Sequence, residues 1–150
     1  MPIKPENKDK YPDNWKEIRE RIRERAGNRC ENCRVHNHAV GYRDENGRFC
    51  RDGGNIYHDL AGEGKSYPSL LPLPYSEAKE LADFLNIEET DGYKWIVIVC
   101  TVAHLDHNPE NNSDNNLAFL CQRCHNRYDR KHRNQTIRSN KLRGQLKIQL

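Results

Sequence analysis

Two Cys-x-x-Cys pairs, Cys30/Cys33 and Cys121/Cys124, constrain the fold of this chain more than any other feature of its sequence. Pairs at this spacing are typical of zinc knuckles, in which each pair supplies two thiolates to one tetrahedral ion. A long stretch of chain separates the pairs, so the fold must bring them together in space. We favour a metal over a disulfide framework because no basic and apolar N-terminal segment marks the chain for secretion. We therefore expect one structural Zn²⁺ held by all four thiolates.

The composition is that of a single domain with a modest core. Hydrophobic residues make up 35% of the 150-residue chain, and the mean hydropathy is −1.08. At this length we expect one domain over residues 1–150, which a structural metal would help to stabilise. No apolar run approaches the roughly 20 residues that are needed to span a bilayer. The expectation is a soluble, cytoplasmic protein with no membrane partner.

Charge is distributed unevenly along the chain. Residues 123–150 carry nine Lys and Arg against the single acid Asp129, whereas residues 35–122 carry six Lys and Arg against fourteen acids. A basic segment directly after a metal-type motif favours binding of a polyanion through its phosphates. The residues predicted to make these phosphate contacts are Arg123, Arg127, Arg130, Lys131 and Arg133.

Hydrophobic periodicity predicts two helices before the central motif. The first starts at Asp13 or Asn14, ends at Gly27 and leads directly into the first knuckle, so that residues 13–33 form one unit. The second begins after Ser76 as N-cap. The apolar faces of the two helices comprise Trp15, Ile18, Ile22 and Ala26 in the first, and Ala78, Leu81, Ala82 and Leu85 in the second.

Three further segments surround these helices. Residues 1–12 contain three prolines and predict a flexible arm. A turn signal at residues 44–47 predicts a hairpin within residues 34–50. We interpret residues 51–92 as an insertion that decorates the site, and its Gly-, Pro- and Ser-rich first part, up to residue 75, as a loop.

The stretch from residue 95 to residue 132 organises the rest of the chain. Its β-branched and aromatic start predicts a buried strand that ends at two closely spaced histidines, His104 and His107. An Asn-rich loop and a second short strand lead to Cys121. The predicted order is a strand over 93–103, a loop over 108–115, a strand over 116–120, a helix over 122–133 and a basic tail or weak helix over 134–150.

The upstream Cys-x-x-Cys, the strand ending in histidine and the run Asn-Leu-x-x-Leu-Cys-x-x-Cys-His resemble the HNH endonuclease family. The resemblance covers residues 30–33 and 95–132. It implies an α+β fold in which a ββα-metal core over 93–133 is joined by an N-terminal helix, a central insertion and a basic C-terminal helical segment. It also implies hydrolysis of phosphodiester bonds in double-stranded DNA, with one catalytic divalent metal such as Mg²⁺ or Mn²⁺ on the structural zinc scaffold.

The resemblance leaves two assignments of the general base open. In the first, His104 is the base and Asn116 orients it by hydrogen bonding across the two strands. In the second, His107 is the base and Asp106 beside it binds the metal. We favour His104, which lies twelve residues before Asn116, because His107 lies only nine residues before it and would leave an unusually tight loop. The metal-ligand position before this base is then Ala103, so Asp106 or His107 must supply the missing contact.

The helix after the second knuckle is expected to complete the metal site. His125 matches the last histidine of the family motif, and Asp129 lies four residues later on the same helix face. The four thiolates form a closed site, so the zinc itself takes no part in hydrolysis. The competing hypothesis is a catalytically inactive, zinc-stapled nucleic-acid-binding module, which the alanine at position 103 favours.

Overall fold

The computed structural model mixes helices and sheets, in agreement with the predicted α+β class, and it describes residues 3, 5–51, 56–58, 64–66, 73–88 and 92–148. The helices are α1 (Trp15–Arg25), α2 (Tyr75–Glu88) and α3 (Gln122–Ile148), with 3-10 turns η1 (Pro5–Lys10) and η2 (Asp114–Asn116). The strands are β1 (Val40–Arg43), β2 (Phe49–Arg51), β3 (Ile56–His58), β4 (Gly64–Ser66), β5 (Trp95–Val97), β6 (Cys100–His104) and β7 (Leu117–Cys121).

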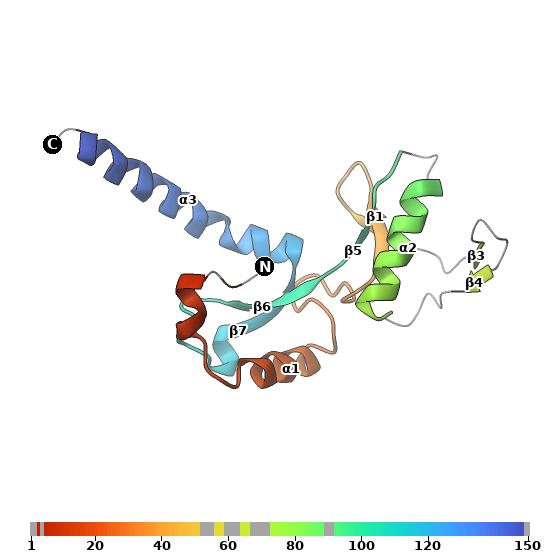
Figure 1. Ribbon diagram of the computed structural model, residues 1–150, viewed down its shortest axis with the longest axis horizontal. Helices are drawn as coiled ribbons and strands as arrows, with labels where there is room; N and C mark the ends of the chain where they lie inside the picture. Colours follow the sequence, from red (N-terminus) through yellow and green to blue (C-terminus); the bar gives the residue numbers. More distant parts are fainter. Residues whose placement is uncertain are drawn as a thin grey trace.

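The strands form small antiparallel sheets at different places in the molecule. β1 is the middle strand of a three-stranded sheet in the order β2-β1-β5, while β3 pairs with β4 and β6 pairs with β7. Helix α1 lies beside the β6–β7 hairpin, and α2 lies against the sheet that contains β1 and β5 (Figure 1). The hairpin predicted within residues 34–50 is therefore confirmed as β1 and β2.

The apolar faces predicted for α1 and α2 are confirmed by their packing. On α1, Ile18 and Ile22 are buried against β6, β7 and the cysteine loops. On α2, Leu81 and Leu85 belong to a second buried cluster with Val40 of β1. Gly27, with φ of +64°, follows α1 in the left-handed conformation that is typical of a helix end.

The single strand predicted over 93–103 is wrong, because the structure has two strands there in two different sheets. β5 pairs with β1, and β6 pairs with β7. Between them, the Ile98 N–H donates to the Ala39 carbonyl at 2.9 Å and the Ile98 carbonyl accepts from the His38 N–H at 2.7 Å. The run of β-branched residues continues across this change of partner, so hydrophobic pattern alone did not reveal the break.

Both ends of the chain contain helical segments. Within the predicted arm over 1–12, residues 5–10 form η1, and the Tyr11 ring packs on Trp15 with 5.0 Å between centroids. After residue 133, where a basic tail or weak helix was predicted, the structure has the helix, since α3 continues as one 27-residue helix and Lys, Arg and Gln are good helix formers. Within the insertion, β3 and β4 replace part of the predicted loop.

Helix α3 starts at the end of β7, and its C-terminal half projects away from the other elements (Figure 1). Ile137 and Leu142 on this half are 58% and 60% exposed. Among the described residues, no helix combines the length and the hydropathy needed to cross a membrane. Over residues 134–144 the side chains of this half are exposed and mainly charged or polar, with Ile137 and Leu142 as apolar exceptions.

Candidate metal centre and active-site cleft

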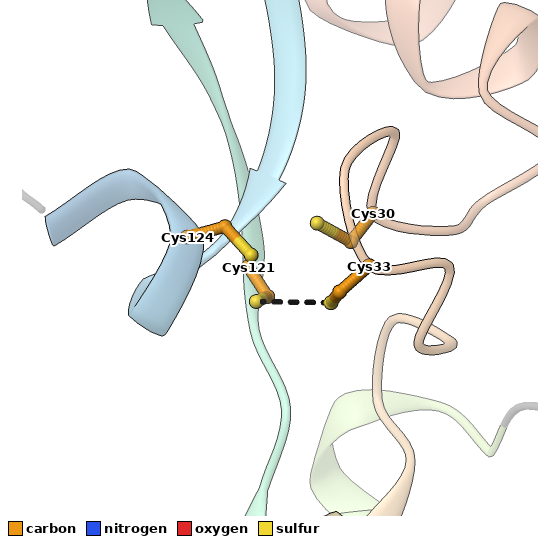
Figure 2. Close-up of side chains that lie close together, drawn as sticks. All are labelled: Cys30, Cys33, Cys121 and Cys124. Carbon is orange, nitrogen blue, oxygen red and sulfur yellow. Dashed lines mark hydrogen bonds between the residues drawn. The ribbon is translucent and has the colours of Figure 1, made fainter. Parts of the chain in front are cut away.

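The four paired cysteines lie together where the loop after α1 meets the junction of β7 and α3 (Figure 2). One sulfur from each of Cys30, Cys33, Cys121 and Cys124 lies within 4.8 Å of the others. The Sγ atoms of Cys33 and Cys121 are 3.7 Å apart. Tetrahedral coordination with Zn–S bonds of about 2.3 Å places sulfurs about 3.8 Å apart. The cluster can therefore hold a metal ion, and its spacing is compatible with structural zinc.

Backbone and side-chain bonds hold the two knuckles together. The first knuckle closes through a hydrogen bond from the Arg34 N–H to the Cys30 carbonyl at 2.8 Å. Glu31 then joins it to β7, because its N–H donates to the Phe119 carbonyl at 2.8 Å and its carboxylate accepts from the Phe119 N–H at 2.7 Å. Arg25 of α1 donates to both oxygens of this carboxylate. The sequence pattern did not single out Arg25 or Glu31 for this bracing role.

The surroundings of the paired cysteines shift their pKa values in different directions. Loss of solvation raises the pKa of the buried Cys121 thiol and, as the largest cause, that of the more exposed Cys33. Burial has the same effect on Cys30, but hydrogen bonds from backbone N–H groups of both knuckles outweigh it and lower the pKa of Cys30 to about 7. Four thiolates this close repel one another unless a cation lies between them. A Zn²⁺ ion held by the four sulfurs would supply the charge that stabilises all four thiolates.

The other two cysteines lie outside this group. Cys100 is buried in the core, as predicted, and burial raises the pKa of its thiol to about 12. Cys50 lies half-buried on β2. Neither thiol belongs to the four-sulfur cluster, so Cys50 and Cys100 offer matched controls for the metal-binding cysteines.

A cleft of about 610 Å³ lies between the N-terminal segment, β6 and the first turns of α3. Its lining includes the ionisable side chains of His104, His107, His125, Asp129 and His132, together with Arg19 and Arg133. Tyr11 and Trp15 also line it. Histidines from β6, from the loop after it and from α3 thus line a single hollow.

His104, the favoured general base, is held by two rings and an amide. Its ring stacks on Trp15 with centroids 5.2 Å apart and an interplanar angle of 15°, and it meets the Tyr11 ring edge-on. His104 Nε2 lies 2.9 Å from Asn112 Oδ1. Because an amide oxygen only accepts, Nε2 carries the hydrogen, and Nδ1 of a neutral ring is left to accept a proton.

His107, His125 and Asp129 form a second group in the same cleft. Asp129 Oδ1 lies 3.5 Å from His107 Nδ1, and Asp129 Oδ2 lies 3.2 Å from His125 Nε2. Thr101 Oγ1 lies 3.0 Å from His125 Nδ1 and fixes that ring from β6. The His107 ring also stacks on His132 at 4.1 Å between centroids. One carboxylate oxygen therefore faces each of two imidazoles.

This group offers metal ligands of two chemical kinds. Burial lowers the pKa of His125, although the nearby Asp129 carboxylate acts in the opposite direction. A neutral imidazole is the form that binds a metal ion. The donors lie farther apart than the cysteine sulfurs, because among the described residues only the cysteines place three or more donors within 4.8 Å of one another.

Asp106 does not join His125 and Asp129 in the cleft. Its carboxylate accepts hydrogen bonds from the Asn108 N–H at 2.9 Å, from Asn111 Nδ2 at 2.8 Å and from Asn116 Nδ2 at 2.9 Å. The bond from the Asn111 side chain makes the largest contribution among those that lower the pKa of Asp106 to about 2. The carboxylate that was predicted to bind the metal thus braces the loop between β6 and η2.

Asn116 shares this bracing role. Its Oδ1 accepts from the Asp106 N–H at 3.2 Å, and its Nδ2 donates to the Asn111 carbonyl at 2.8 Å as well as to Asp106. The amide that contacts the His104 ring is that of Asn112. The side chain of Asn116 therefore bonds to the loop between β6 and η2 and not to the His104 ring.

We expect acid to loosen this loop within a defined range of pH. The carboxyl pKa of Asp106 falls from roughly 3.9 in an unfolded chain to about 2 in the folded one. A lowered carboxyl pKa stabilises the fold above pH 4, and this contribution is lost as the pH falls from 4 towards 2. Amide resonances of Asn108 and Asn116, followed by NMR, should shift across this range in the wild type. They should be insensitive to it in Asp106→Asn, and equal titration of both proteins would contradict the assignment.

The five basic residues predicted to contact phosphates lie on different faces of α3. Arg133 lines the cleft, whereas Arg123 and Arg127 line a separate hollow beside the cysteines. Arg130 and Lys131 are exposed along the helix. Two residues along an α-helix turn by about 200°, so Arg123 and Arg127 point away from the cleft. The structure therefore does not bring the five together.

The cleft lining includes residues that the sequence pattern did not mark as functional, among them Tyr11, Thr101 and His132. Asn112 does not line the cleft, but its side chain contacts His104 Nε2. His132 had the clearest signal, because it follows Asp129 by three residues and so lies on the same helix face. The contacts of Tyr11 and Thr101 depend on how distant segments pack, which no local pattern reveals.

Comparison with known proteins finds no match, since no protein-family model, no curated protein and no solved structure is significantly similar to the chain. The functional assignment rests on the residues of the cleft and on their geometry.

Proposed function

We propose that the protein is a metal-dependent endonuclease of the HNH type, which hydrolyses phosphodiester bonds in DNA. The observation that carries the proposal is the cleft, in which a ring-stacked imidazole, His104, lies in the same hollow as His125 and Asp129. The order of the elements supports it. An antiparallel hairpin, β6 and β7, leads directly into a helix, α3, as the family resemblance implies.

His104 acts as the general base in this proposal. The Asn112 amide holds Nε2, so Nδ1 is the atom that takes a proton from the attacking water. Stacking on Trp15 fixes the ring plane. A base fixed in this way removes the entropic cost of bringing a mobile side chain to the water.

His125, Asp129 and His107 hold the catalytic divalent cation in this proposal. The buried Ala103 has no donor to offer, and His107 supplies the missing contact from the neighbouring loop. When bound, the cation neutralises charge on the phosphate and stabilises the leaving oxygen. Because imidazoles outnumber carboxylates here, we expect Mn²⁺ or another transition-metal ion to support activity better than Mg²⁺.

Cleavage of supercoiled plasmid tests the proposal directly. We expect nicking with Mn²⁺, weaker nicking with Mg²⁺ and none when the catalytic metal is withheld. Asp129→Asn should lower the cleavage rate by about 100-fold or more. Substitution of a residue that only supports a metal ligand already costs about 10–100-fold in metal affinity or activity, and loss of the ligand itself should cost at least as much. Asp83→Asn is the matched control, since Asp83 pairs with Lys79 on α2 away from the cleft. Equal rates for the two variants would refute the metal assignment.

A nucleic-acid-binding module without catalysis is the second candidate function. The observation that favours it is Ala103, which stands where the family resemblance implies a metal ligand and is 2% exposed. In that case the protein binds duplex DNA but releases it intact with every divalent metal. The plasmid experiment separates the two functions.

A further inference from the structure

A second hollow lies beside the cysteine cluster, on the face of α3 that points away from the cleft. It has a volume of about 500 Å³, and both knuckles, the β1–β2 turn and α3 contribute to its wall. Five guanidinium side chains line it, and we name them the arginine bowl: Arg34, Arg43, Arg48, Arg123 and Arg127. No Asp or Glu is among the described residues that line it.

The β1–β2 turn fixes part of the arginine bowl in place. The Gly47 carbonyl accepts from Arg43 Nη1 at 3.3 Å and also from Arg123 Nη1. Gly47 has a φ of +73°, and a Cβ there would lie 3.1 Å from Arg123 Nη2. A glycine therefore lets the turn approach α3 closely. Arg48 is fixed separately by Asp44, with 2.9 Å between Nε and Oδ2.

Arg34 and Arg127 are the members whose guanidinium groups are left to bind a ligand. Both are exposed, and neither forms an ion pair or a side-chain hydrogen bond among the residues that the structure describes, whereas Arg43 and Arg123 donate to the Gly47 carbonyl. A zinc ion with four thiolates has about two negative charges in excess. These two negative charges and the carboxylate of Asp44 would offset three of the five guanidinium charges. The arginine bowl then keeps a net charge of about +2.

The chemistry of the arginine bowl matches a phosphate group. All five cations are arginines, whose planar guanidinium donates two parallel hydrogen bonds to a phosphate, whereas lysine acts as a point charge. The positive surface also continues along the same face of α3. Arg130, Arg138 and Lys141 follow Arg127 at helical spacing, all exposed. From Arg123 to Lys141 this row spans about 27 Å at 1.5 Å per residue.

We propose that the arginine bowl binds a backbone phosphate of a nucleic acid, at a site distinct from the phosphate in the cleft. The row of basic residues on α3 leads the backbone away from it. A single nucleic acid then contacts two opposite faces of α3, with one backbone phosphate in the cleft and another in the arginine bowl. The proposal takes the identity of the ligand from the proposed function but does not depend on catalysis.

Equilibrium binding of a fluorescent duplex DNA, without added divalent metal, tests this site apart from cleavage. We expect Arg34→Ala/Arg127→Ala to weaken binding about tenfold or more at low salt. The slope of log affinity against log salt should fall by about 2, close to one for each phosphate contact removed. Lys8→Ala/Lys16→Ala is the matched control, because it removes the same charge from residues that line neither hollow. The control should bind like the wild type.

Zinc content, measured in parallel, separates binding from folding. If the alanine variant keeps its zinc and binds like the control, the proposal is overturned. If the alanine variant loses its zinc, the Arg34→Lys/Arg127→Lys variant is tested in its place. This variant keeps both positive charges but cannot donate two parallel hydrogen bonds to a phosphate. The lysine variant should then bind DNA more weakly than the wild type; unchanged binding would show that the arginines only balance the thiolates.

A competition experiment separates nucleic acid from an acidic polypeptide. Unlabelled duplex should displace the labelled duplex at much lower charge concentration than polyglutamate does. Equal displacement by polyglutamate, abolished in Arg34→Ala/Arg127→Ala, would overturn the proposal in favour of an acidic protein partner. If the arginine bowl does not bind DNA, plasmid cleavage still tests the proposed nuclease activity. The two proposals can therefore be refuted separately.

Discussion

Cys121→Ser is expected to lose the bound metal and to unfold the part of the protein that contains α1, β6, β7 and α3. Cys121 is only 1% exposed and belongs to the main buried cluster. Structural zinc contributes apparent binding free energies of about 10–16 kcal/mol in small domains. This binding free energy is as large as the whole free energy of unfolding of a typical domain, which is about 5–15 kcal/mol. Metal analysis and thermal unfolding by circular dichroism should show the loss together.

Cysteines outside the cluster supply the controls for this prediction. Cys50→Ser changes a half-buried thiol on β2 and should keep both zinc and fold. Cys100→Ser changes a buried core thiol, so it should lower the melting temperature while the zinc content stays at one ion. A Cys121→Ser protein that keeps one equivalent of zinc and a cooperative transition would rule out the four-thiolate site.

His104→Ala and His107→Ala are expected to impair DNA cleavage in different ways. Loss of a general base lowers the rate by about 10²–10⁴-fold, and added metal cannot compensate for it in His104→Ala. His107 faces Asp129 at 3.5 Å, so His107→Ala should instead raise the metal concentration required for half-maximal activity. Single-turnover cleavage rates measured across a Mn²⁺ series distinguish a lower plateau from a shifted midpoint.

The pH dependence of the remaining activity gives an independent test of the same roles. In the wild type and in His107→Ala at saturating metal, the rate should fall on the acidic side as the base becomes protonated. In His104→Ala this acidic limb should disappear, and added imidazole should restore part of the rate. If the limb persists in His104→Ala and disappears in His107→Ala, the two histidines exchange roles.

Features that depend on near neighbours in the chain were predictable. The apolar face of α1 follows from residues three and four positions apart, and Gly27 ends the helix as expected. The hairpin of β1 and β2 follows from its turn residues. Placement of the cysteine pairs together was also predictable, because two thiolates per pair leave a zinc ion half-coordinated and demand a partner pair.

Features that depend on which segments meet were not predictable. The break at Ile98 arises because β5 and β6 pair with different strands, although their residues form one continuous apolar run. Asp106 was expected at a metal, yet three hydrogen bonds from its own loop hold its carboxylate. A carboxylate near histidines in sequence has no fixed direction until the loop that carries it has folded.

The sequence alone established the ligand types: four thiolates in two pairs, closely spaced histidines, one acid on a basic helix. The chemistry of a side chain is fixed by its identity and survives any fold. Tertiary packing decided which of these groups share a hollow, because it placed Trp15 against His104 and brought the β1–β2 turn and both cysteine loops beside Arg123 and Arg127. Distances between residues far apart in the chain depend on the whole set of packed contacts. For that reason the cleft and the arginine bowl became visible as separate sites only in the folded protein.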